Sequence, residues 1–202
     1  MNNKHTPNDK FSLSKNGQLR YFPDFLSMNE ATSLYVRLCN DVSWQEESIM
    51  LFGQVRKVPR LIAFYGDEAV TYTYSKRLHT ATRWSDVLLS LKGRIEAMTK
   101  ERFNSVLCNY YRDGGDAMGW HADNERELGV DPFIASLSFG VTRKFKVRHN
   151  RTKEQYSLML EGGSLLLMSG KFQQHWQHSM PRSRKIHDGR INLTFRQVST
   201  FR

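Results

Sequence analysis

Two segments in the first half of the chain repeat apolar residues at the spacing of an amphipathic helix. The first begins after Ser27, which precedes Glu30 by three residues as in a capping box, and its apolar positions predict a helix over about residues 28–40. The second is a continuous apolar stripe that predicts a helix over residues 85–100. We therefore expect two helices before the middle of the chain.

After residue 104 the pattern changes to short runs that are rich in β-branched and aromatic residues and are separated by Gly, Asp and Pro. These runs are SVLCNYYR, FIASLSFG, RKFKVRH, QYSLML, GSLLLMSG and RINLTFRQV. Helices followed by many strands predict an α+β fold, in which N-terminal helices buttress a β-sandwich or barrel.

The length of 202 residues and the apolar fraction of 39% suffice for one compact domain. The polar residues 1–18 predict a flexible N-terminal arm, so we expect the domain to span residues 19–202. Cys39 and Cys108 lack the spacing of a disulfide framework or a zinc site. The polar start and the lack of a long apolar run lead us to expect a cytoplasmic monomer without membrane contact, nucleoid-associated in a bacterium or nuclear in a eukaryote.

The net charge of +10 favours a polyanionic partner such as nucleic acid. Composition alone does not decide this, because basic charge also serves to keep a protein in solution. The motifs must therefore carry the functional argument.

The most informative short motif is a possible metal site at His121 and Asp123. In extended chain, residues two apart point the same way, so the imidazole and the carboxylate can bind one ion. A second imidazole would complete the facial triad of two His and one carboxylate that is typical of non-haem iron(II). His178 is our candidate, with His175 as the rival. By itself, a His–x–Asp motif is more often a surface pair.

A second motif is a strand near the C-terminus that has one polar face. The polar positions are Arg190, Asn192, Thr194 and Arg196. Two arginines on the inner face of a β-sandwich require anionic partners, and guanidinium groups match carboxylates. The alternative is a solvated sheet surface. Asn109 and Tyr111 repeat the alternation on another strand, with an amide and a phenol that can hydrogen-bond a carboxylate.

Together, these residues resemble the AlkB family of 2-oxoglutarate dioxygenases, whose motifs occur in the same order. The resemblance covers about residues 19–198 and is closest to the branch that repairs double-stranded DNA. It implies a double-stranded β-helix, or jelly roll, in which iron(II) is held by His121, Asp123 and His178. It also implies that 2-oxoglutarate is bound by Asn109, Tyr111, Arg190, Asn192, Thr194 and Arg196.

The resemblance implies an activity as well. In the family, O2 and 2-oxoglutarate are consumed to oxidise an alkyl group on a base, and aldehyde, succinate and CO2 are released. We therefore expect oxidative dealkylation of N-alkylated bases in DNA, a repair reaction. The alternatives are RNA or transfer-RNA demethylation and hydroxylation of a substrate that is not nucleic acid. An inactive binding module is disfavoured, because every metal ligand is present.

A predicted hairpin within residues 45–75 is the candidate region for nucleotide recognition. Its turn carries Phe52, an apolar wedge that can fill the gap left by an extruded base, with Arg60 on the following strand as a phosphate contact. The resemblance places an aromatic and an arginine at these two positions. The alternative is that Phe52 is an ordinary core residue.

Further substrate contacts are assigned to Tyr72, Tyr74, Asn124 and Glu125. By resemblance, Tyr74 stacks on the extruded base against His121, although phenylalanine is common at this position in the family. Asn124 departs from the acidic residue that relatives commonly carry there, and an amide both donates and accepts hydrogen bonds. Base selectivity therefore depends on Tyr74 and Asn124.

Basic residues crowd one strand and the turn after it. They are Arg143, Lys144, Lys146, Arg148, Arg151 and Lys153. We interpret this stripe as a surface that tracks phosphates, although such a run is often only a solvated face. Arg182, Arg184 and Lys185 follow His178 and are candidates for the same groove.

Overall fold

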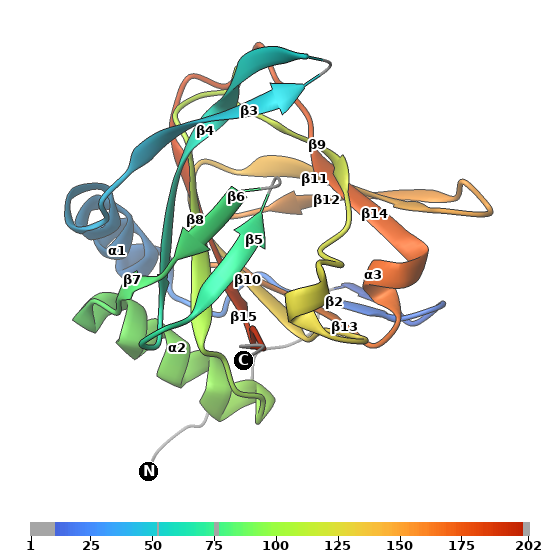
Figure 1. Ribbon diagram of the computed structural model, residues 1–202, viewed down its shortest axis with the longest axis horizontal. Helices are drawn as coiled ribbons and strands as arrows, with labels where there is room; N and C mark the ends of the chain where they lie inside the picture. Colours follow the sequence, from blue (N-terminus) through green and yellow to red (C-terminus); the bar gives the residue numbers. More distant parts are fainter. Residues whose placement is uncertain (1–10, 52, 75–76, 200–202) are drawn as a thin grey trace.

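The computed structural model describes residues 11–51, 53–74 and 77–199, and Figure 1 shows two β-sheets with two long helices packed against the larger one. The helices are α1 (Met28–Asp41), α2 (Asp86–Thr99) and the short α3 (Phe172–His175). The strands are β1 (Phe11–Leu13), β2 (Gln18–Phe22), β3 (Gln45–Leu51), β4 (Gln54–Gly66), β5 (Thr71–Tyr74), β6 (Arg77–Thr80), β7 (Thr82–Arg83), β8 (Ser105–Tyr111), β9 (Met118–His121), β10 (Ile134–Gly140), β11 (Arg143–His149), β12 (Gln155–Leu160), β13 (Leu165–Ser169), β14 (Trp176–Met180) and β15 (Arg190–Arg196).

The strands form a sandwich of two sheets. The larger sheet has nine strands in the order β1-β2-β13-β10-β15-β8-β4-β3, with β7 paired to β4, and the smaller has four in the order β12-β11-β14-β9. Strands of both sheets contribute to one apolar cluster between them, which includes Leu166, Phe145 and Trp176. This is the jelly roll that the resemblance implied, and the expected α+β class is confirmed.

Alternation along the central strands separates an apolar face from a polar one. Ile191, Leu193 and Phe195 of β15 belong to the cluster that packs under α1 and α2. The residues between them face the space between the sheets, beside their register partners on β8 and β10, which include Asn109 and Ser138. The polar face predicted for this strand is therefore an inner face.

Both helices lie where the apolar pattern predicts them. The Ser27 Oγ accepts a hydrogen bond from the Glu30 backbone N–H at 3.3 Å and caps α1. The stripe of α2 is buried against the larger sheet, and the helix ends at Lys100, whose φ of 65° is left-handed. These helices form the outer layer behind the strands that carry the polar face (Figure 1).

The chain becomes ordered before Leu19, contrary to our expectation for residues 1–18. Leu13 of β1 pairs with Leu19 of β2 and is buried, so residues 11–18 belong to the larger sheet rather than to an arm. The turn depends on Gly17, whose φ is +115° and where a Cβ would lie 2.2 Å from the Phe172 backbone nitrogen. A strand of three residues is too short to show alternation. Residues 1–10 lie outside the described residues.

The predicted hairpin is present as β3 and β4, which pair from Gln45 with Ile62 to Leu51 with Gln54 at the turn. Phe52 lies outside the described residues. Strands β5 and β6 form a second hairpin. Within the described part of the chain, no helix is long and apolar enough to cross a membrane.

Candidate active site

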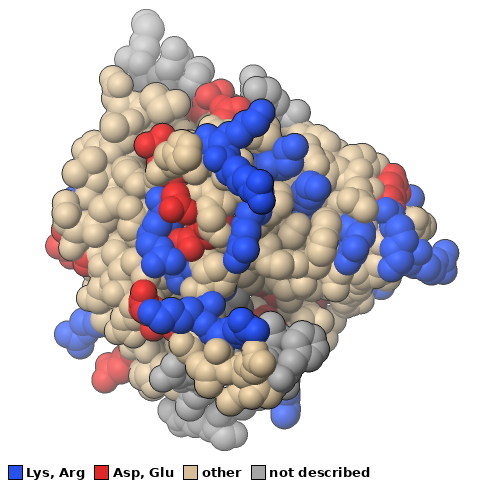
Figure 2. All heavy atoms as spheres, turned by 90° about the horizontal axis from the view of Figure 1, so that it is seen from above, with Lys and Arg blue, Asp and Glu red and all other residues tan. Residues whose placement is uncertain are grey.

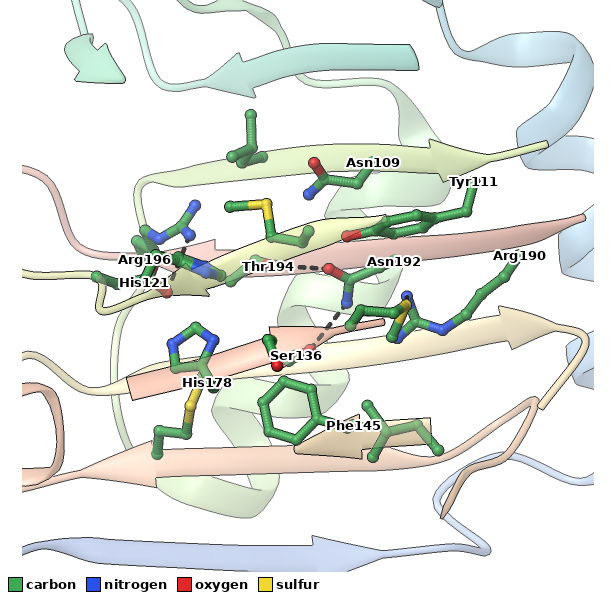
Figure 3. A pocket seen from close by; sticks show the side chains of 17 residues that line it. Asn109, Tyr111, His121, Ser136, Phe145, His178, Arg190, Asn192, Thr194 and Arg196 are labelled. Carbon is green, nitrogen blue, oxygen red and sulfur yellow. Dashed lines mark hydrogen bonds and ion pairs between the residues drawn. The ribbon is translucent and has the colours of Figure 1, made fainter. Parts of the chain in front are cut away.

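Two strands of the smaller sheet bring the predicted metal ligands together. His121 at the end of β9 is the register partner of His178 in β14, and Asp123 follows two residues after His121. The ligand atoms of these three residues all lie within 4.8 Å of one another. Figure 3 shows the His121 and His178 rings at the same end of the cavity. The proposed triad is therefore one cluster.

The rival His175 lies elsewhere. It ends α3, and its ring stacks on that of His149 with centroids 6.0 Å apart and an interplanar angle of 5°. Among the described residues, the metal-ligand cluster contains His178 and not His175.

The surroundings keep the imidazoles neutral and the carboxylate charged. Burial, followed by the neighbouring His121, lowers the pKa of His178 to about 3, and burial also lowers the pKa of His121. Burial would raise the pKa of Asp123, but Arg196 and the two imidazoles outweigh it and hold that pKa below its ordinary range. Arg196 Nη2 lies 3.1 Å from Asp123 Oδ2. Each ligand is therefore in its metal-binding protonation state.

The donor set fits iron(II). The carbonyl of Gly119 can only accept a hydrogen bond, so the His121 Nδ1 atom at 2.9 Å carries the proton and leaves Nε2 free to bind a metal. The Nε2 atom of His178 is buried and has no hydrogen-bond partner among the described residues. Two neutral imidazoles and one carboxylate on one side of a cavity are the ligands of non-haem iron(II).

The same cavity extends away from the triad between the two sheets. Figure 3 shows His121, His178 and Arg196 at one end and Tyr111 and Arg190 at the other. All six residues predicted to bind oxoglutarate line this cavity, and they are Asn109, Tyr111, Arg190, Asn192, Thr194 and Arg196. The solvated-surface alternative for the β15 face is wrong, because every residue of β15 is buried.

Arg190 is a buried cation without a carboxylate partner among the described residues. Its side chain donates to Ser138 Oγ at 2.9 Å and to the Met180 sulfur at 3.6 Å. Its guanidinium carbon lies 5.5 Å from the centre of the Tyr111 ring. Burial lowers its pKa to about 10, and within the described part of the chain its Nε atom has no hydrogen-bond partner. A buried charge of this kind is costly unless an anion reaches it.

The amides of the cavity are held by neighbouring polar groups. Asn192 donates to Ser136 Oγ at 2.8 Å and accepts from the Thr194 hydroxyl at 3.0 Å. Asn109 Oδ1 accepts from Arg60 Nε at 2.7 Å. These bonds fix the side chains before a ligand enters, which reduces the entropy lost on binding.

Among the predicted substrate contacts, Tyr72 and Glu125 lie beside the triad. Tyr72 is buried, its ring lies 5.6 Å from the Arg196 guanidinium carbon, and burial raises the pKa of its hydroxyl, as do the nearby carboxylates of Asp123 and Glu125. Burial, followed by the charge of Asp123, raises the pKa of Glu125. Asn124 is exposed. The backbone of Tyr74 lies in β5, but its side chain is outside the described set.

Two arginines that were expected to contact phosphates, Arg60 and Arg143, are buried. Arg60 is only 4% exposed and donates to the cavity residue Asn109, so it lies behind that residue and is not an exposed contact for phosphates. Arg143 is 1% exposed and donates to the backbone oxygens of Asp113, Asp116 and Pro181, which joins two loops. Both arginines alternate with buried apolar residues of their own strand, Arg60 with Val58 and Ile62 and Arg143 with Phe145 and Val147, so strand periodicity was a usable signal for their inward orientation.

The structure also assigns roles to residues that sequence reasoning missed. Gln173 of α3 accepts a hydrogen bond from the Asp123 backbone N–H at 3.0 Å and so positions the carboxylate ligand. No local motif marks this glutamine. Ser136 and Ser138 alternate with apolar residues in FIASLSFG, and that alternation was a usable signal.

Comparisons with known proteins agree with this geometry. A model of the 2OG-Fe(II) oxygenase superfamily matches residues 18–196. The chain is 40% identical to alpha-ketoglutarate-dependent dioxygenase alkB homolog 3 of Rattus norvegicus over 201 residues, or 94% of this chain and 68% of that protein. It is 42% identical to DNA oxidative demethylase ALKBH2 of Mus musculus over 158 residues, or 74% and 66%. A solved structure, OsALKBH1, has the same fold with a TM-score of 0.66 at 17% identity, covering 93% of this chain and all of that one.

Proposed function

The chain belongs to the AlkB family of 2-oxoglutarate- and iron(II)-dependent dioxygenases, and we propose that it removes alkyl groups oxidatively from N-alkylated bases of DNA. The observation that carries the proposal is one cavity with a His–Asp–His cluster at one end and Arg190 at the other, where this buried arginine has no carboxylate partner among the described residues. The net charge of +10 and the names of the curated relatives support nucleic acid as the substrate.

The metal would be held by His121, Asp123 and His178, the donor set of non-haem iron(II). Iron supplies the oxidation of the alkyl carbon with O2 and oxoglutarate, and the products are aldehyde, succinate, CO2 and the restored base. Gln173 and the Gly119 carbonyl hold the ligands in place. No side-chain general base is needed.

We assign the far end of the cavity to one carboxylate of 2-oxoglutarate. Arg190 would pair with it, which compensates the buried charge, and Tyr111 lies against the same guanidinium. Arg196 lies at the metal end, where its Nε and Nη1 atoms have no hydrogen-bond partner among the described residues. Asn109, Asn192 and Thr194 line the path between the two ends.

We assign the mouth of the cavity to the damaged base. Glu125, half-buried beside the metal ligands, offers a carboxyl of the kind that hydrogen-bonds the edge of an extruded base, and the fully buried Tyr72 lies behind it. Arg60, buried beside Asn109, borders the same wall. Phe52, Tyr74 and Asn124 remain candidate base contacts on the grounds of the sequence.

The test is aldehyde release from matched N-methylated duplex DNA, single-stranded DNA and RNA, with and without 2-oxoglutarate. We expect oxoglutarate-dependent release from DNA that exceeds release from RNA. Greater turnover of RNA would replace DNA repair by RNA demethylation. Oxoglutarate consumption without release from any of the three would favour a substrate other than nucleic acid.

A further inference from the structure

The outer face of the smaller sheet, opposite the metal ligands, forms a second surface. Val147, His178 and His121 are register partners across β11, β14 and β9, and they point into the sandwich. Alternation therefore turns the residues next to them outward, namely Arg148, Gln177 and Trp120. Trp120 precedes the iron ligand His121 directly on the edge strand β9, with its side chain on the opposite face of the sheet.

Trp120 forms a held aromatic platform on this face. The guanidinium carbon of Arg148 lies 4.4 Å from the centre of the Trp120 ring, and Arg148 Nη2 donates to Gln177 Oε1 at 3.0 Å. The three side chains come from adjacent strands and fix one another. The indole remains partly exposed. Because the Arg148 guanidinium lies over one face of the indole, an unpaired nucleobase stacks on the other face of the ring, with the guanidinium holding the indole in place.

The platform continues into a basic groove. The four strands β9, β11, β12 and β14 contain no Asp or Glu. Lys144 and Lys146 of β11 and Arg182 line a hollow of about 310 Å³ between the β11–β12 pair and the loop after β14. Figure 2 shows Lys and Arg side chains gathered from the middle of the molecule to its projecting end, which is the turn between β11 and β12 in Figure 1.

We propose that this outer face binds an unpaired stretch of the nucleic-acid strand that carries the reacting base. One nucleobase stacks on Trp120, and the phosphates that follow it contact Lys146 and Lys144 in the groove. The partner is unpaired because, inside a duplex, both faces of a base are already stacked on its neighbours. Charge complementarity and the place of Trp120 on β9, the edge strand that also carries His121, support this occupant. The inference rests on the proposed function, because it supplies a path for the strand of that same substrate.

Binding of an unmodified, fluorescein-labelled single-stranded 12-mer tests the surface by anisotropy, without a need for turnover. Trp120→Ala should weaken binding about tenfold or more, and Trp120→Phe should restore most of it, because phenylalanine keeps a stacking face. In Lys144→Ala/Lys146→Ala, the plot of log association constant against log salt concentration should become shallower, its negative slope decreasing in magnitude by about 1.4, or about 0.7 for each lost phosphate contact.

The matched control is Arg37→Ala/Arg83→Ala, which removes the same charge from exposed positions on α1 and β7. It should leave affinity and salt slope near those of the parent. The proposal is overturned if Trp120→Ala binds like the parent, or if the control double variant loses as much affinity as the Lys144/Lys146 variant. Dealkylation of a methylated oligonucleotide together with unchanged binding in both test variants would reject the surface and leave the proposed function intact. Thermal melts show which variants are folded. If Trp120→Ala does not fold, the Lys144→Ala/Lys146→Ala variant, whose substitutions are at the surface, still decides the test.

Discussion

At the scale of single residues, Arg190 and Arg143 are two buried guanidinium groups with opposite local chemistry. Arg143 donates three hydrogen bonds to backbone oxygens. Arg190 has one hydroxyl and one sulfur as partners and faces the cavity. The first therefore stabilises the fold, whereas the second is a binding group whose charge is compensated by a ligand. The difference can be measured.

In Arg190→Met, we expect the dissociation constant for 2-oxoglutarate to rise by about 30-fold or more, because truncating one partner of a buried charge pair costs about 2–5 kcal/mol. Without oxoglutarate, the free energy of unfolding should not fall below that of the parent, since an uncompensated buried charge is removed. Calorimetric titration and chemical denaturation measure the two effects.

Arg143→Met is the control for this prediction, with the reverse outcome. It should lower stability by at least about 1 kcal/mol through its lost hydrogen bonds, and it should leave oxoglutarate affinity unchanged in the folded fraction. Arg190 would have to be reassigned to phosphate contact if Arg190→Met lost nucleic-acid affinity at a normal oxoglutarate dependence.

A second prediction at this scale separates the two neighbouring histidines. His178→Ala should lose stoichiometric iron(II) binding while remaining folded, because two ligands cannot hold the ion in facial geometry. His175→Ala should retain it, because that ring stacks on His149 outside the cluster. Metal content after anaerobic loading and a circular dichroism melt check both statements. Normal iron content in His178→Ala would dismiss the triad.

At the scale of elements, the β3–β4 hairpin carries the sharpest functional distinction. Its strands pair as far as Leu51 with Gln54, and they border the wall of the cavity through the pairing of β4 with β8. An inserted aromatic recovers part of the stacking that is lost when a base leaves a duplex, whereas a single strand has little such cost. We therefore expect the hairpin to affect turnover of duplex substrates and not of single-stranded ones.

Phe52→Ala should lower turnover of a methylated duplex about tenfold, equivalent to about 1.4 kcal/mol, and barely change turnover of the same single strand. Val55→Ala on the same hairpin, where the parent side chain is 68% exposed, should leave both rates unchanged. Aldehyde release measured on both substrates decides. Equal losses with a lowered melting temperature would make Phe52 a core residue, and no loss would remove the hairpin from base extrusion.

Element patterns predicted the fold and most of the candidate site. The alternation in β15 and β8 identifies six cavity residues, and periodicity identifies both long helices, because each is long enough to show its period. Strand β1 and Gln173 were not predictable, because a three-residue strand has no measurable period and Gln173 acts through a contact 50 residues away. Arg60 and Arg143 were misplaced although they alternate with buried apolar residues of their strands, because basic charge by itself favours an exposed position.

At the scale of the whole molecule, acid should destabilise the fold through the buried imidazole of His178. Its pKa of about 3 lies below the ordinary value of 6.5, so between these pH values the unfolded chain binds a proton that the folded chain does not. Stability is therefore full above about pH 6.5 and falls with decreasing pH, by up to about 1.4 kcal/mol per unit for this one proton. Asp123, whose folded pKa is also lowered, acts in the same direction at lower pH.

Urea denaturation in the presence of a chelator at pH 7, 6 and 5 measures this dependence. We expect the free energy of unfolding to decline with pH in the parent and in His175→Gln, and to decline less in His178→Gln. Parallel declines in all three proteins would assign the acid sensitivity to other groups.

The place of β15 in the larger sheet bears on how the enzyme is made. This strand follows every other strand in the chain, yet it lies between β10 and β8. On a ribosome, a chain that has not yet released residues 190–196 has two unpaired edges at the centre of its sheet, and such edges are prone to aggregation. It also lacks Arg190 and Arg196, so the triad of β9 and β14 has no cosubstrate pocket beside it. The complete cavity, with the His–Asp–His cluster at one end and Arg190 at the other, therefore forms only once synthesis has passed β15.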